Sequence, residues 1–422
     1  MIRVLFLALI LGAFTTIYSQ EQETEDLQFL IIEAISNNPE IAAQVSRMAV
    51  FEHKVTQRWA LDDPELILRW MEMPGFRFSE AMYANIELMQ MVRFPTKLFM
   101  ERSIAQIQAE HAHHEHLEKV LDVVARLKSA YAMLWYARTA LQLNRENQSF
   151  LRQILDAATA QYSVGKASQQ DVLKTSIELA KLRAEEEALK QDVVSTESML
   201  RAILNRDSRK PIGPISGLPL PAVSYNVEEL VSFALTARPM VVHDSLSVNE
   251  SALMLGLQKQ EYLPDLRLGL EYVTMPLLGE KRWSVTAGIT LPIAPWSLSK
   301  ASARVQEASA ERSMRESMFL ATRRMIEAQV RQNYATFKGY ESRVKAYEST
   351  ILPQTDQSLR TLLTEYQTGR TSFLMLLDSF RMFQMAKMEA AMALAQYHQS
   401  LAALERSVGV TTLSAVPKEN EQ

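Results

Sequence analysis

The sequence predicts a mainly α-helical protein with a small β part, built from one unit that occurs twice in tandem. Two Gly-centred turns indicate the duplication, since Tyr162-Ser163-Val164-Gly165 returns as Tyr366-Gln367-Thr368-Gly369 roughly 200 positions later. Three prolines recur at a similar offset: Pro39, Pro64 and Pro95 correspond to Pro239, Pro264 and Pro292. Long segments of helical periodicity lie between these landmarks, so the repeated unit is rich in long helices.

The composition excludes several classes of protein. The chain has 422 residues, a net charge of −4 and no cysteine. This charge gives no basic surface for nucleic acid, and the lack of cysteine excludes thiol catalysis, Cys-based zinc sites and disulfide bonds. The sequence contains no phosphate-binding Gly loop, catalytic-triad motif or metalloprotease motif, so we expect neither an enzyme nor a cofactor.

Residues 1–19 have the pattern of a secretory signal peptide. Met1-Ile2-Arg3 supplies the charged start, residues 4–14 are apolar, and Ile17-Tyr18-Ser19 is an imperfect cleavage segment. An N-terminal membrane anchor is the alternative, although the apolar run is short for a membrane span. No later segment is apolar over the length of a spanning helix, so the exported chain is not expected to enter a membrane as an α-helix.

The first repeat is expected at residues 24–209. Residues 26–59 are apolar at helical spacing and contain a break at Asn38-Pro39, which predicts two short helices. A long helical hairpin follows at about residues 96–205. Its descending arm lacks Pro and Gly and would be on the order of 100 Å long, while its return arm carries a coiled-coil seam.

The second repeat has the same order of elements. The remaining parts are a Pro-rich connector at residues 210–224, a second repeat at 225–410 with a long helical hairpin at about 298–408, and a flexible tail at 411–422. In the second descending arm, Gly339 and Pro353 are expected to interrupt the helix. Helices of this length are too long for one globular core, so we expect them to span a distance.

Each repeat also carries a β-hairpin, at about residues 65–93 and 265–292. Apolar and polar residues alternate there over about ten positions, which is typical of transmembrane β-barrel strands. A half-buried sheet in a soluble domain is the alternative. The predicted lipid-facing residues are Leu66, Leu68, Trp70, Leu266, Leu268, Leu270, Val285 and Ile289.

Four strands in one chain cannot close a barrel. An open sheet edge in lipid leaves backbone N–H and C=O groups unpaired, at a cost of several kcal/mol each. Two chains would supply eight strands, whose own side chains fill the interior, whereas three would supply twelve and leave a lumen. If the strands lie in lipid, the chain must therefore assemble with copies of itself.

The order of short helices, β-hairpin, long helical hairpin and connector, repeated once, resembles the TolC-like outer membrane efflux protein family. The matching segments are Asn38-Pro39-Glu40-Ile41, Tyr262-Leu263-Pro264-Asp265-Leu266 and the two Tyr-x-x-Gly-x-x-Ser turns, and the resemblance covers nearly the whole mature chain. It implies a homotrimer with a shared barrel in the outer membrane and an α-helical periplasmic tunnel. It also implies a periplasmic adaptor protein and an inner-membrane transporter as partners, for which this chain would be the passive exit duct.

The resemblance places the adaptor-docking and aperture region at the two Gly-centred turns. The candidate residues are Tyr162, Gly165, Ser168, Asp171, Leu173, Tyr366, Gly369, Arg370, Ser372, Leu377 and Asp378. An acidic ring formed by Asp171 and Asp378 would attract cations to the pore mouth; alternatively, these residues only end and cap helices. Met375 and the position of Arg370 depart from the family pattern, so the family's closing salt bridge is not carried over.

A histidine cluster offers a second candidate site, at His111, His113, His114 and His116. Imidazole favours divalent transition metals, which would suit a metal-exporting channel. The four side chains point around the helix, however, so a solvated helix face is the other interpretation. Metal efflux, drug efflux and type I secretion are all compatible with the sequence. Outside the channel class, the alternative is a soluble periplasmic coiled-coil adaptor.

Overall fold

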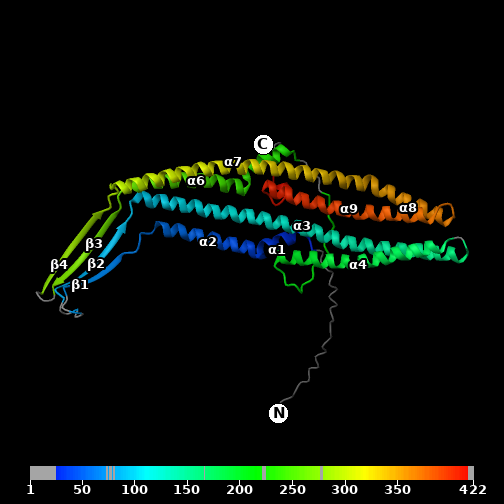
Figure 1. Cartoon of the computed structure of the whole chain (residues 1–422), viewed down its shortest axis with the longest axis horizontal. Helices are drawn as coiled ribbons and strands as arrows, with labels where there is room; N and C mark the ends of the chain where they lie inside the picture. Colours follow the sequence, from blue (N-terminus) through cyan, green and yellow to red (C-terminus); the bar gives the residue numbers. More distant parts are fainter. Residues whose placement is uncertain are drawn as a thin grey trace, which may run out of the picture.

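The computed structural model describes residues 25–416 except 73–74, 76–77, 79–80, 166, 221–224 and 276–278. The predicted signal peptide and the end of the predicted tail lie outside the described residues. The molecule is elongated, with its helices running side by side from a four-stranded sheet at one end to two helical turns at the other (Figure 1). This length follows from the helices, since each helical residue adds about 1.5 Å.

The two short helices of each repeat meet at the predicted Pro positions. They are α1 (Leu27–Asn37) and α2 (Pro39–Trp59) in the first repeat, and α5 (Val227–Ala237) and α6 (Pro239–Lys259) in the second. The Asn38 side chain accepts hydrogen bonds from the backbone N–H groups of Glu40 and Ile41 and caps α2. Asn38 also donates to the carbonyl of Ile203 at 2.8 Å, which fixes this corner to the long helical hairpin.

The long helices have the predicted bounds with one correction. They are α3 (Pro95–Ser163), α4 (Gln169–Leu204), α7 (Pro295–Ala346), α8 (Leu352–Gln367) and α9 (Phe373–Val408). Gly339 does not interrupt α7, because Gly within a helix costs only about 1 kcal/mol and does not remove a hydrogen-bond donor. Pro353 does mark a change: one π-helical turn at Tyr347–Ile351 precedes it, and α8 then begins with Pro353 in its first turn. None of the described helices is both long and apolar enough to cross a bilayer.

The four strands form one antiparallel sheet in the order β1-β2-β3-β4. They are β1 (Glu65–Met71), β2 (Tyr83–Val92), β3 (Leu266–Met275) and β4 (Glu280–Ile289). Pairing of β2 with β3 joins the two repeats, and β1 and β4 are the free edges.

The register places all eight predicted apolar strand residues on one face of the sheet. Leu66, Leu88, Leu270 and Val285 form one row across it, and Leu266 pairs with Ile289 near one end. The eight side chains are between 38% and 79% exposed. The alternation therefore predicted this face correctly, and among the described residues no helix covers it, although Phe78 packs edge-on against Trp70.

The buried apolar residues form three separate clusters along the length of the molecule. Two clusters lie where the short helices of each repeat pack on the long helices, and a third lies at the helical turns. Leu413 and Val416 belong to the cluster of the second repeat and are 5% and 4% exposed. The predicted flexible tail is therefore wrong for residues 411–416, because apolar side chains after the last long helix pack back onto that cluster.

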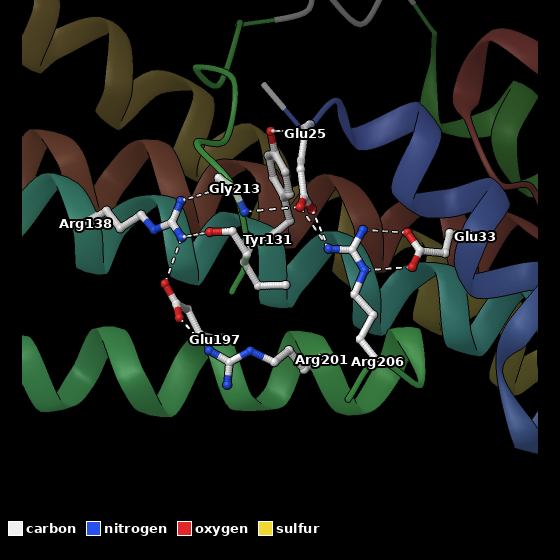
Figure 2. Close-up of polar contacts among 9 residues, drawn as sticks. Glu25, Glu33, Tyr131, Arg138, Glu197, Arg201, Arg206 and Gly213 are labelled. Atoms are coloured by element: carbon white, nitrogen blue, oxygen red, sulfur yellow. Dashed lines mark hydrogen bonds and ion pairs between the residues drawn. The ribbon is translucent and has the colours of Figure 1, made fainter. Parts of the chain in front are cut away.

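The connector after α4 is held by buried charged groups (Figure 2). The Arg206 side chain, 8% exposed, donates to Glu33 at 2.7 and 2.6 Å and to Glu25 at 2.8 and 2.9 Å. Hydrogen bonding to Glu33, against the effect of burial and with a further contribution from Glu25, raises the pKa of Arg206. Arg138 donates to the carbonyls of Gly213 and Ile212 at 2.7 and 2.9 Å. These contacts tie α1, α3 and α4 to one extended segment.

Candidate functional site

The two helical turns have the backbone geometry that their sequences predict. Gly165 has a φ of +73° and Gly369 a φ of +74°, a region in which Gly avoids the steric cost that other residues meet. The following helices begin with capping residues: Ser372 Oγ accepts from the N–H of Met375 at 3.4 Å, and Asp171 Oδ2 accepts from the N–H of Ser168 at 3.2 Å. Lys166, within the first turn, is outside the described residues.

The two turns lie side by side at the end of the molecule opposite the sheet (Figure 1) and share one core. Phe150 of α3 stacks on Phe380 of α9 with ring centroids 5.4 Å apart. Arg381 of α9 donates to Glu178 of α4, which links the two hairpins. Burial raises the pKa of Glu178, but hydrogen bonds from Arg381 and Lys181 outweigh it, so this pKa lies below its ordinary value. The two hairpins are thus packed together next to their turns, and residues 162–165, 167–173 and 366–378 are called the helical tip below.

The structure divides the predicted tip residues into exposed and buried groups. Tyr162 and Leu173 are 47% and 55% exposed, and the Asp378 side chain is 72% exposed. Leu377 and Tyr366 are only 2% and 5% exposed and belong to the shared core. These two residues therefore hold the tip together and do not present side chains to a partner, which corrects their assignment to a docking surface.

Asp171 and Asp378 differ in environment. Asp171 is half-buried and caps α4 through Ser168, whereas the Asp378 carboxylate is paired, among the described residues, with Arg381 at 3.9 Å. Burial raises the pKa of Tyr366, and the negative charge of Asp171 raises it further. Asp171 therefore acts first as a helix-capping residue that faces the tip core, and Asp378 as a surface charge.

The histidine cluster lies where α3 packs on α6. His111 Nε2 is 3.1 Å from Glu250 Oε2, and the His111 ring lies against that of His243, tilted by 57° with the ring centroids 4.4 Å apart. His113 is exposed, while His114 lines a cavity of about 450 Å³ with His243, Glu115 and Glu118. Burial, reinforced by His113 and other nearby histidines, lowers the pKa of His114.

This arrangement replaces the metal interpretation of His111, His113, His114 and His116. Within residues 25–416, apart from the gaps named above, no three His, Asp or Glu side chains gather in a group that could hold a metal ion. The three carboxylates of the cavity are paired with arginines instead: Glu115 with Arg47 at 3.1 Å, Glu118 with Arg238 at 2.9 Å and Asp122 with Arg406 at 3.0 Å. Arg238, which occupies the helix break of the second repeat, was not singled out from the sequence because its partners lie far away in the chain.

The other face of the sheet carries charged and polar side chains, interspersed with Ile67, Met89 and Met91, and is called the polar face below. Moving across it, Arg69 pairs with Asn85, Glu87 with Glu271, and Glu271 with Ser284. At the junction of sheet and helices, Lys97 Nζ donates to Asp265 at 3.0 Å and to the carbonyl of Leu263 at 3.0 Å, with the Lys97 side chain only 6% exposed. The sheet thus has one apolar and one charged face, and a buried ion pair fixes it to α3.

The comparisons with known proteins agree with this architecture. The family described as outer membrane efflux protein matches residues 80–206 and 230–410, which include three of the four strands and all the long helices. The chain belongs to the outer membrane efflux protein family. No curated protein matches it by sequence.

Solved outer-membrane channels share the fold of this efflux protein over almost its whole length. The outer-membrane channel OprN is 16% identical, with 91% of this chain and 89% of that chain covered and a TM-score of 0.76. VceC of Vibrio cholerae is 15% identical, with 91% and 96% covered and a TM-score of 0.76. The CmeC channel of Campylobacter jejuni is 14% identical, with 92% and 87% covered and a TM-score of 0.77.

These findings confirm the family resemblance and the channel interpretation. The protein is an outer membrane efflux channel whose helices extend into the periplasm, and it is not an enzyme. The alternative of a soluble coiled-coil adaptor is excluded by family membership. The exposed apolar face of the sheet is the structural feature that such an adaptor would not require.

Proposed function

We propose that three copies of the chain pool their sheets into one closed barrel, which forms the passive exit duct of a tripartite export system. The observation that carries this proposal is the open sheet with one apolar face whose predicted lipid-facing side chains are 38–79% exposed. In lipid, the edges β1 and β4 need partner strands, and edge pairing between copies supplies them. Three copies give twelve strands, enough to enclose a lumen lined by the polar face.

Apolar side chains along the helices support the same assembly. Ile177, Val194 and Met199 of α4 are 55–62% exposed, and Met314, Met318, Leu320 and Met325 of α7 are 47–63% exposed. Helix faces of this kind need a partner over their length. In the trimer we assign these faces to contacts between neighbouring copies, which extends the barrel as a helical tunnel.

The helical tip is the proposed docking site for the periplasmic adaptor and, through it, the inner-membrane transporter. Its exposed residues Tyr162, Val164 and Leu173 lie on the first hairpin, and Leu374 and Met375 on the second. Gly165, Ser168, Gly369, Arg370 and Ser372 shape the two turns. The shared tip core would let both hairpins respond together when a partner binds.

The proposal is tested by Asp378→Asn in planar bilayers. Three exposed carboxylates at the tunnel mouth attract cations, so we expect the variant to lower the cation-over-anion permeability ratio severalfold. Asp378→Glu keeps the charge and should retain the wild-type ratio. An unchanged ratio in Asp378→Asn, measured on a conducting trimer, would contradict a place for Asp378 at the tunnel mouth.

A further inference from the structure

Two carboxylates meet on the polar face of the sheet. Glu87 of β2 and Glu271 of β3 occupy directly opposite positions in the register. Residues in such positions have Cβ atoms about 4.5–5.5 Å apart, and like charges there destabilise the pairing of the strands. Another group must therefore compensate for the second negative charge.

Nearby basic side chains compensate only in part for the negative charges of Glu87 and Glu271. Arg69 Nη2 lies 4.0 Å from Glu87 Oε2, at the limit of an ion pair, and Arg282 is engaged by Glu280 at 2.7 Å. The hydrogen bonds to Glu271 from described residues come from neutral groups, the Asn85 amide and the Ser284 hydroxyl, the latter at 3.3 Å. Among the residues that the structure describes, the Glu271 carboxylate thus has no charged partner of its own.

Asn85 provides an independent indication of a missing ligand. It is 3% exposed, and its Oδ1 has no hydrogen-bond partner among the described residues. Its amide nitrogen donates to Glu271 Oε1, which places the amide group directly against the carboxylate. A buried amide oxygen is costly to leave unpaired, so a group that accepts electron pairs from oxygen would satisfy it.

We propose that Glu87, Asn85 and Glu271 bind one Ca²⁺ ion on the polar face between β2 and β3. Carboxylate, amide and hydroxyl oxygens are the ligands of hard cations, and Ca²⁺ accepts irregular sets of six to eight oxygens, including water. Ser284 supplies the nearby hydroxyl.

The chemistry favours Ca²⁺ over Mg²⁺ and over transition metals. Mg²⁺ demands near-ideal octahedral geometry and retains its water, which an irregular set of strand side chains does not match. The site contains no imidazole or thiolate, the ligands that select transition metals. With only two carboxylates, we expect a dissociation constant on the order of 10⁻⁴–10⁻³ M.

That the site faces a lumen rests on the proposed function, because the lumen exists only in the trimer. The binding site itself does not depend on the trimer. All its residues lie on adjacent strands of one chain, so a single copy of the sheet can bind the ion. In the proposed trimer, three such ions would lie at one level of the barrel and reduce the negative charge of the lumen.

Equilibrium dialysis of the detergent-purified full-length protein against CaCl₂ tests the proposal. We expect one Ca²⁺ per chain, and Glu87→Gln and Glu271→Gln should each weaken binding by about tenfold or more. Asn85→Asp adds a third carboxylate and should tighten binding by about tenfold. A gain in affinity cannot result from misfolding, so this variant keeps the test decisive.

Glu280→Gln is the matched control, because it removes one carboxylate from the rim of the same sheet, where the side chain is 51% exposed. It should leave Ca²⁺ binding unchanged. Absence of binding at about 10 mM CaCl₂, well above the expected range, or wild-type affinity in Glu87→Gln, Glu271→Gln and Asn85→Asp, would overturn the proposal. The mass of each sample reports trimer formation separately, so loss of the ion and loss of the barrel are distinguishable.

Discussion

Replacing Leu270 by arginine is expected to abolish recovery of the protein as an outer-membrane oligomer. Leu270 lies mid-strand on the apolar face, opposite Leu88 and Val285, and is 44% exposed. A cationic side chain near the bilayer midplane costs about 2–4 kcal/mol on the lipid face of a barrel, and a trimer carries three. Membrane fractionation and non-denaturing electrophoresis would measure the loss.

Met89→Arg is the control for this substitution. Met89 pairs with Gly269 on the polar face, two residues along β3 from Glu271, so the same charge is introduced into the same strand pair but on the face opposite to Leu270. We expect this variant to assemble. Normal assembly of Leu270→Arg would instead place the apolar face in contact with water or protein.

Arg206→Met is expected to cause the second large effect, a loss of stability at the connector. Arg206 is the shared partner of Glu25 and Glu33, whose side chains are 17% and 16% exposed. Removing one member of a buried charge cluster leaves the others uncompensated and typically costs about 3–5 kcal/mol. Denaturant unfolding followed by helical circular dichroism, with limited proteolysis of residues 207–219, would measure it.

Arg209→Met provides a matched comparison because Arg209 is exposed and three residues from Arg206, and only its backbone N–H, which the substitution keeps, donates to a described carboxylate, that of Asp207 at 2.9 Å. This variant should unfold like the wild type. Arg206→Lys should recover only part of the stability, since an ammonium group cannot reproduce the paired contacts of guanidinium with two carboxylates. Equal stability of Arg206→Met and Arg209→Met would show that the cluster does not hold the connector.

Local sequence signals were sufficient for much of this fold. Pro39, Pro95, Pro239 and the two turn glycines mark element boundaries because they change the backbone itself. The exposed apolar face followed from alternation, since a period of two assigns every second side chain to the same face. Because the unit is duplicated, each of these signals occurs twice in the sequence, which strengthened its interpretation.

The features that sequence reasoning missed depend on contacts between distant segments. Leu377 looked like an exposed tip residue, but Phe150 and Leu151 of the other hairpin pack in the same core. The neighbouring sequence does not indicate that Arg206 and Arg238 are buried, because their partners Glu33 and Glu118 lie more than 100 residues away. No local pattern reports such pairs. The carboxylates Glu87 and Glu271 likewise meet only because β2 pairs with β3.

The most direct test of the central claim is the mass of the signal-cleaved protein extracted in detergent, measured together with membrane fractionation. A pooled barrel predicts three chains per particle, recovered from the outer membrane, because only closure satisfies the edges of β1 and β4 in lipid. A monomer in the soluble periplasmic fraction would contradict the account and place the apolar face of the sheet outside the membrane.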